Sequence, residues 1–181
     1  FMPAFSGGGS ALNMLRLARE FHRAGHETQI VVTRARGEFV DKVPEGVRLV
    51  DLGAARIIAA FPGLVRYFRR ERPDAMLVAV APANCMAISA RRLARLATRL
   101  VISERNNLTM ATAEARNWRM RIMPAIMRWS YPHADAVVAV SSGVADDLSR
   151  VIGMPREQIS VIFNPVVTEE ILQLSREPVD H

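Results

Sequence analysis

The sequence predicts a doubly wound α/β fold, in which helices cover both faces of a mostly parallel sheet. Continuous apolar runs of strand length alternate with amphipathic helix patterns along the whole chain, as in sheets that are buried on both faces. The chain has 181 residues, of which 50% are hydrophobic and 23% are charged. This length suits one domain with a substantial core. The near-average composition excludes disorder, collagen-like repeats and a coiled coil.

The first half of the chain predicts two helices and three strands. The run Ser-Gly-Gly-Gly-Ser at 6–10 precedes a helix at 11–24, which Gly25 ends. The apolar side of this helix contains Met14, Leu15, Leu17, Ala18 and Phe21. The elements that follow are strands at 28–33 and 47–52, a helix at 56–72 ended by Pro73, and a strand at 75–81.

The second half repeats the alternation. It predicts a helix at 83–96, a strand at 100–103, a long helical region at 112–130, a strand at 136–140, a helix at 143–152 and a strand at 159–163. Pro124 is expected to kink the long helical region or to divide it into two helices. Ser142 is the expected N-cap of the next helix, because Asp146 and Asp147 follow it closely.

Charge and cysteine content narrow the classes of partner. The formal net charge of +6 favours anionic partners, such as phosphorylated substrates, anionic lipid or nucleic acid. The lone Cys85 excludes a disulfide framework and a thiolate metal cluster, and the four histidines lack the spacing of metal ligands. The sequence shows no signal-peptide pattern and no run of the ~20 apolar residues that a membrane span needs. Because the chain begins with Phe1, we expect residues upstream.

Gly7, Gly8 and Gly9 follow the first expected strand and begin the first helix, where doubly wound sheets bind ligands. Glycines let the free N–H groups of a helix start approach an anion, so the loop predicts a phosphate cradle. The alternative is a tight turn that needs positive φ. A dinucleotide fingerprint is incomplete, because Leu12 replaces its third glycine and Thr-Arg at 33–34 suits at best a phosphorylated cofactor. No Walker A sequence follows the glycines.

A second polar run, Ser-Glu-Arg-Asn-Asn at 103–107, directly follows a strand and therefore lies on the same rim. Arg105 can hold a phosphate or a carboxylate in a bidentate fork, and the alternative is a solvated loop with an Asx turn. For Ser-Ser-Gly at 141–143 helix capping is the favoured interpretation. A hydrolase is not expected, because no nucleophile elbow, Cys–His pair or acid pair is present in the sequence.

Six motifs occur in register over nearly the whole chain. They are Ser-Gly-Gly-Gly at 6–9 with Leu-Ala at 17–18, Ala-Gly-His-Glu at 24–27, Arg-Pro-Asp at 72–74, Ser-Glu-Arg-Asn at 103–106, Ala-Asp-Ala-Val-Val-Ala-Val-Ser at 134–141 and Phe-Asn-Pro-Val at 163–166. In this order the chain resembles the amino-terminal, Rossmann-like half of GT-B glycosyltransferases of the retaining family 4. This family builds lipopolysaccharide, capsule and other glycans.

The resemblance implies a two-domain enzyme that moves a sugar from a nucleotide-activated donor to a glycan or lipid-linked acceptor. Residues 1–165 would form the acceptor-binding domain, with its first strand incomplete. Residues 166–181 would begin the linker toward an absent nucleotide-sugar domain, which in the family carries two glutamates spaced eight apart. We therefore expect the isolated chain to be inactive, and we expect neither a metal nor a cofactor.

The resemblance also assigns residues to the site. Gly7, Gly8 and Gly9 would approach the donor diphosphate. The expected acceptor-binding residues are Asn84, Glu104, Asn106 and Asn107. Arg105 is the candidate catalytic residue, although many family members place a histidine there, so its role cannot be copied from them. Two alternatives stay open: an NADP-binding module, favoured by Thr33 and Arg34, and a non-catalytic binding domain.

One stretch suggests a location. Residues 116–123 and 126–129 mix arginine with Trp and Met, as interfacial helices do. Together with the positive charge, this predicts peripheral attachment to the inner face of a membrane. Separately, we expect a cytoplasmic protein without a nucleic-acid partner. The alternative is an ordinary helix that covers the sheet and whose Trp and Met residues are in the core.

Overall fold

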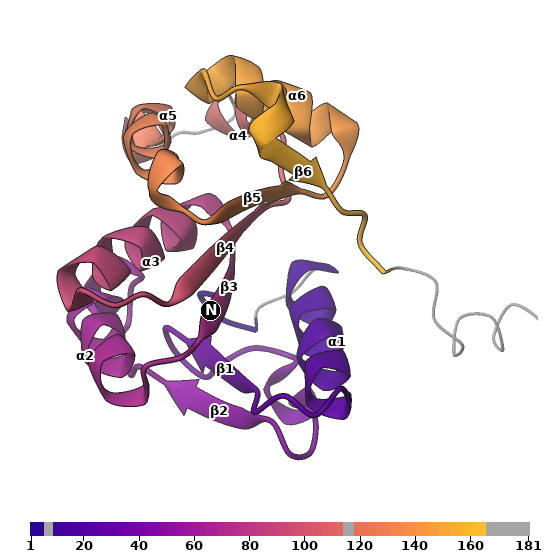
Figure 1. Ribbon diagram of the computed structural model, residues 1–181, viewed down its shortest axis with the longest axis vertical. Helices are drawn as coiled ribbons and strands as arrows, with labels where there is room; N and C mark the ends of the chain where they lie inside the picture. Colours follow the sequence, from indigo (N-terminus) through magenta and orange to yellow (C-terminus); the bar gives the residue numbers. More distant parts are fainter. Residues whose placement is uncertain (6–8, 114–117, 166–181) are drawn as a thin grey trace, which may run out of the picture.

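The computed structural model describes residues 1–5, 9–113 and 118–165 (Figure 1). It contains a four-stranded sheet in the order β3-β4-β5-β6 and a pair β1-β2, and every strand pair is parallel. The strands are β1 (Gln29–Val32), β2 (Arg48–Asp51), β3 (Ala75–Ala79), β4 (Arg99–Glu104), β5 (Ala136–Ala139) and β6 (Ile159–Val161). The predicted parallel α/β architecture is confirmed.

The first two residues join the two sheets. Met2 forms a parallel bridge with Val32. On the other side, the amino group of Phe1 donates to the carbonyl of Leu77 at 2.6 Å, and the N–H of Ala79 donates to the carbonyl of Phe1 at 3.3 Å. The strand order is therefore β2-β1-(residues 1–2)-β3-β4-β5-β6, and the direction of progression reverses between residues 1–2 and β3. This reversal is the switch point at which such sheets bind ligands.

Helices cover both faces, as predicted (Figure 1). They are α1 (Gly9–Arg23), α2 (Phe61–Glu71), α3 (Ala81–Ala94), α4 (Leu108–Ala113), α5 (Trp118–Ser130) and α6 (Ser142–Ile152), with short 3-10 turns η1 (Val40–Lys42), η2 (Ile58–Ala60), η3 (Tyr131–His133) and η4 (Arg156–Gln158). Alternate strand residues point to opposite faces. Ile30 and Val32 therefore pack with α1 in the smaller core, whereas Val31 belongs to the larger core under α2, α3, α5 and α6.

Two local expectations are wrong, those for Phe21 and for the N-cap of α6, and two others, for Pro124 and for the start of the long helical region, are changed in part. Phe21 is 44% exposed, because the last turn of α1 extends past the smaller core. The N-cap of α6 is Ser141, whose hydroxyl accepts the N–H of Val144, and not Ser142. Pro124 lies inside α5 and does not separate two helices, and the kink expected there stays a prediction. Helix α4 begins at Leu108, four residues before the predicted start of the helical region. Within the described residues, no helix is long and apolar enough to cross a membrane.

Candidate functional site

The carboxyl ends of the parallel strands form one edge of the sheet, which we call the carboxyl edge (Figure 1). The start of α1 follows residues 1–5 there, Val80 follows β3, Arg105 follows β4, and Asn164 lies shortly after β6. In a parallel sheet these segments share an edge by topology, so residues far apart in sequence become neighbours. The polar run at 103–107 lies on the same rim as the start of α1, as expected.

Gly9 is the first residue of α1. A Cβ atom built on Gly9 meets nothing within 4 Å, and the φ of Gly9 lies outside the positive range that favours glycine. At this position the fold itself therefore does not require glycine, and the turn interpretation loses its support there. Open space beside a helix start is what a bound anion needs. Gly7 and Gly8 lie outside the described residues, so their predicted contact with a diphosphate stays a prediction.

Val80 was not singled out by the sequence. It connects β3 to α3 at the switch point, with φ 80° and ψ 126°. A β-branched residue at positive φ is strained, at a cost on the order of 1–3 kcal/mol. Its carbonyl accepts the N–H groups of Ala83 and Asn84, at 2.9 and 3.0 Å, and so begins α3. Strained backbone of this kind clusters at functional sites. No pattern in the sequence predicts it.

Arg105 is half-buried at this edge. Its Nη1 donates to Oδ1 of Asn164 at 3.0 Å, and its Nη2 approaches Sδ of Met14 at 3.8 Å. Its Nε is buried without a hydrogen-bond partner, and no carboxylate pairs with Arg105 among the described residues. Burial lowers the pKa of Arg105, but a guanidinium stays charged. The site thus holds a positive charge that lacks a counter-ion within the part of the chain described.

Helix α1 and the segment after β6 meet beside Arg105. Arg16 of α1 donates to the carbonyl of Pro165 at 3.2 Å, next to the Asn164 that binds Arg105. Helix α1, the residue after β4 and the segment after β6 therefore meet at the carboxyl edge. A charged, planar guanidinium such as that of Arg105 can bind a phosphate or a carboxylate in a bidentate manner.

Glu104 and Asn84 are inside the protein. Asn84 is fully buried and Glu104 is 2% exposed. The Nδ2 of Asn84 donates to Oε1 of Glu104 at 2.7 Å and contacts the hydroxyl of Tyr131 at 3.1 Å, and that hydroxyl donates to Glu104. In this structure the two residues bind each other and η3. Their contact with an acceptor stays a prediction, and their burial favours a positioning role at the end of β4.

Burial raises the pKa of Glu104 to about 7, although the hydrogen bonds from Tyr131 and Asn84 lower it. The carboxyl group therefore titrates near neutral pH. Burial also raises the pKa of Tyr131 well above its usual value and the pKa of the Cys85 thiol to about 11, so both stay neutral there. The cluster is a buried, hydrogen-bonded support for the backbone that carries Arg105.

Asn106 and Asn107 have different roles in the fold. Asn106 is exposed on the rim, where a ligand can reach it. The Oδ1 of Asn107 accepts the N–H of Met110 at 2.9 Å, and thus caps α4. The buried Asp147 of α6 caps the same helix by accepting the N–H of Leu108 at 2.7 Å. Burial raises the pKa of Asp147, but hydrogen bonds, first that of Thr109, outweigh this effect and the net pKa is lowered.

The described residues contain three buried side-chain atoms without a hydrogen-bond partner, and all three lie at or next to the carboxyl edge. They are Oγ1 of Thr33, Oδ1 of Asn84 and Nε of Arg105. Most buried polar atoms in proteins are hydrogen-bonded, so each of these three atoms has an unused capacity for a hydrogen bond. Thr33 is buried, so of the pair proposed for a phosphorylated cofactor only Arg34 is exposed. In the described ranges, no group of three or more His, Cys, Asp or Glu residues can hold a metal ion.

Comparisons with known proteins agree with this fold. The family model described as Glycosyltransferase Family 4 matches residues 7–170. The lipopolysaccharide outer core galactosyltransferase WaaB in its apo form has a similar fold, with TM-score 0.68 and 18% identity over 91% of this chain and 44% of WaaB. HepE from Anabaena in complex with UDP-glucose gives a TM-score of 0.64 and 14% identity over 97% of this chain and 48% of HepE. No curated protein matches. The chain thus spans less than half the length of these two structures.

Proposed function

The chain belongs to glycosyltransferase family 4, and on that premise we propose that it is the acceptor-binding half of a retaining glycosyltransferase. The complete enzyme would move a sugar from a nucleotide-activated donor to a glycan or lipid-linked acceptor. HepE was crystallised with UDP-glucose and WaaB is named as a galactosyltransferase, which supports a nucleotide sugar as the donor. The family favours this function over an NADP-binding module.

The observation that carries the proposal is Arg105. Its guanidinium is half-buried, has one unpartnered N–H and lies between Met14 of α1 and Asn164. We propose that it binds an anionic oxygen of the donor diphosphate or of the acceptor. The diphosphate would lie against the start of α1, where Gly7, Gly8 and Gly9 allow the backbone to approach it closely.

The buried cluster would act indirectly. Asn84 and Tyr131 hold the carboxyl of Glu104, which immediately precedes Arg105 in the chain. Arg105 and the exposed Asn106 are thereby placed on the rim, and Asn106 is the residue of this run most open to an acceptor. Because Glu104 is buried, the proposal assigns no covalent intermediate to it.

Catalysis would require donor and acceptor to be held together in one site. Since this chain spans less than half of WaaB and HepE, we propose that the nucleotide is bound mainly by a second domain. The 181-residue chain alone would then bind free nucleotide weakly and transfer no sugar. No metal and no cofactor are part of the proposal.

The test is release of nucleotide from a panel of nucleotide sugars, with a membrane and glycan extract as the source of acceptors. The complete gene product should release nucleotide from at least one donor, and Arg105→Lys should slow it, because lysine lacks the planar fork. The 181-residue chain should be inactive, and chelation of metals should change nothing. If the complete product acts on no donor, the domain is a non-catalytic binding module.

A further inference from the structure

The outer side of α5 is apolar and exposed. Ile122, Ile126 and Trp129 are 43%, 39% and 66% exposed, and their spacing places them on one side of the helix. Met127, between them in sequence, points the other way and is fully buried in the larger core. The core interpretation is therefore right for Met127 and wrong for Trp129.

The apolar side of α5 continues onto α3. The guanidinium of Arg92 stacks over the ring of Trp129, 5.6 Å from its centroid. Leu93, the next residue of α3, is 52% exposed. An exposed tryptophan, an exposed leucine and an arginine thus adjoin on two packed helices. Contiguous exposed apolar side chains of this kind commonly mark an interaction surface.

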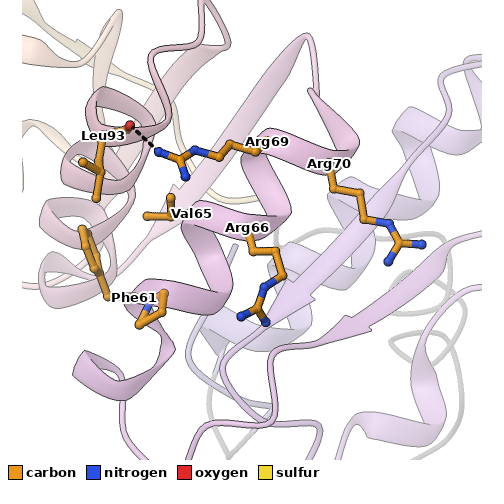
Figure 2. A pocket seen from close by; sticks show the side chains of 7 residues that line it. Phe61, Val65, Arg66, Arg69, Arg70 and Leu93 are labelled. Carbon is orange, nitrogen blue, oxygen red and sulfur yellow. Dashed lines mark hydrogen bonds between the residues drawn. The ribbon is translucent and has the colours of Figure 1, made fainter.

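A shallow groove between α2 and α3 extends this surface (Figure 2). Phe61 and Val65 of α2 and Leu93 of α3 form its apolar lining. Arginines surround that lining: Arg69 reaches across to the carbonyl of Leu93 at 3.2 Å, and Arg66 and Arg70 extend from α2 into solvent (Figure 2). The groove therefore combines an apolar floor with a rim of cations.

Acidic side chains are almost absent from these three helices. Their sequences contain one, Glu71 at the end of α2, and it pairs with Arg48. Exposed arginines of the same helices are Arg66, Arg69, Arg70, Arg92 and Arg121. Arg128 is exposed too, but its Nε donates to the carbonyl of Ile152 on α6. The outer surface of α2, α3 and α5, here named the helical face, is therefore cationic with an apolar ridge.

We propose that the helical face docks on an anionic lipid bilayer, with Ile122, Ile126 and Trp129 in the interfacial region and the arginines against the lipid phosphates. This combination is what interfacial helices present to a membrane. A second copy of the chain would place arginine against arginine, and a nucleic acid would leave the aliphatic ridge without a partner. The cytoplasmic leaflet of a cell membrane, which is anionic, is the matching surface.

The docking leaves the candidate site accessible. Helices α2, α3 and α5 cover one face of the sheet, whereas Arg105 lies at the carboxyl edge. Arg92, Leu93 and Trp129 are near the C-terminal ends of their helices, and so lie toward the opposite edge of the sheet. The proposal does not depend on glycosyl transfer, since lipid binding can be measured without a donor.

The test is co-sedimentation of the chain with vesicles of phosphatidylcholine alone or mixed with phosphatidylglycerol. Binding should require the anionic lipid and should weaken as salt rises. Arg66→Gln with Arg70→Gln should weaken it about fivefold for each arginine removed. The control is Arg19→Gln with Arg23→Gln on α1, which removes the same charge from the opposite face and should leave most of the binding.

The apolar ridge is tested in the same assay. Ile126→Ser with Trp129→Ser should release the chain from anionic vesicles, whereas Phe21→Ser with Phe163→Ser, at exposed positions elsewhere, should not. In Trp118→Phe, Trp129 is the remaining tryptophan, and brominated lipid should quench its fluorescence. Unchanged melting temperatures establish that the variants are folded. Binding that ignores lipid charge, equal losses in the control variants, or no quenching would each overturn the proposal.

Discussion

The two edges of the sheet use arginine in opposite ways. The amino ends of the strands form the opposite edge, here called the amino edge. There Arg91 donates to the carboxylate of Asp135, to the carbonyl of His133 and, at 2.9 Å, to the carbonyl of Thr98. Asp135 also accepts the N–H of Leu100 at 2.7 Å, and that backbone hydrogen bond is the main reason why its pKa is lowered. These groups satisfy one another, so the hydrogen bonds of Arg91 stabilise the fold.

The carboxyl edge is less completely bonded. Arg105 has one amide oxygen and a sulfur as partners, its Nε has none, and Val80 nearby is strained. A buried, unpartnered donor costs about 1–3 kcal/mol, which a protein recovers when a ligand accepts the hydrogen bond. The difference shows that the hydrogen bonding of the side chain, and not the residue type, separates an arginine that stabilises the fold from one that we propose binds a ligand.

The largest expected effect is a dependence of stability on pH that has opposite sign at the two edges. The pKa of Glu104 is raised from 4.5 to about 7, so the folded state prefers the protonated form. Its contribution to stability is complete below pH about 4.5 and is lost as the pH rises toward 7, a loss on the order of 3 kcal/mol. The pKa of Asp135 is lowered, so the stability that its carboxylate contributes to the fold is instead lost as the pH falls.

Urea unfolding of the wild type and of Glu104→Gln between pH 4 and 8 separates the two. Glutamine keeps the shape and can accept the hydrogen bonds of Asn84 and Tyr131, but it does not ionise. The variant should therefore lack the loss of stability between pH about 4.5 and 7, and should keep the loss at acidic pH. Identical profiles for both proteins would mean that Glu104 ionises freely.

The second effect concerns activity. Arg105→Ala in the complete enzyme should remove one charge-assisted hydrogen bond to the substrate, which costs about 1.5–3 kcal/mol or roughly ten- to a hundredfold in turnover. Its free energy of unfolding should change little, because the guanidinium is poorly bonded in the free protein. If kcat and KM are unchanged in Arg105→Ala, the loop that carries Arg105 is solvated surface and does not bind the substrate.

Arg91→Ala is the matched change at the amino edge. It removes a guanidinium that bonds one carboxylate and two carbonyls, and should lower the free energy of unfolding by about 2 kcal/mol. Activity per folded molecule should be retained, because Arg91 lies far from the carboxyl edge. Chemical denaturation and kinetics on the same two variants give a direct comparison, and a loss of turnover in Arg91→Ala without unfolding would break the distinction between the edges.

Most of the fold was predictable because the hydrophobic pattern is local. The strand starting at Ala75 and the helices ended by Gly25 and by Pro73 were placed within a few residues. The errors arose where tertiary context decides. Phe21 fits the apolar stripe of α1, but the core ends before it. Both serines at 141–142 can cap a helix. Ser141 is the N-cap because its backbone is extended and its hydroxyl accepts the N–H of Val144.

The site was predictable as a location but not as a set of contacts. The topology of a parallel sheet places Gly9, at the start of α1, and Arg105 on one edge. The pairing of Asn84 with Glu104, 20 residues apart, and that of Arg105 with Asn164, 59 residues apart, follow from side-chain packing that no sequence pattern encodes. The strain at Val80 has no signature either.

The smallest effect tests whether the carboxyl edge is kept open at a cost to stability. Gly9 begins α1 without positive φ, and a Cβ there meets nothing within 4 Å. Gly9→Ala should therefore raise the free energy of unfolding by about 0.4–1 kcal/mol, because alanine restricts the unfolded chain and suits a helix. Turnover of the complete enzyme should nevertheless fall, since the added methyl group occupies the space proposed for the diphosphate. Gly143→Ala, at the start of α6, meets the same open space and should raise stability without any effect on turnover. If both variants keep full activity, the glycine at position 9 has no part in binding the donor.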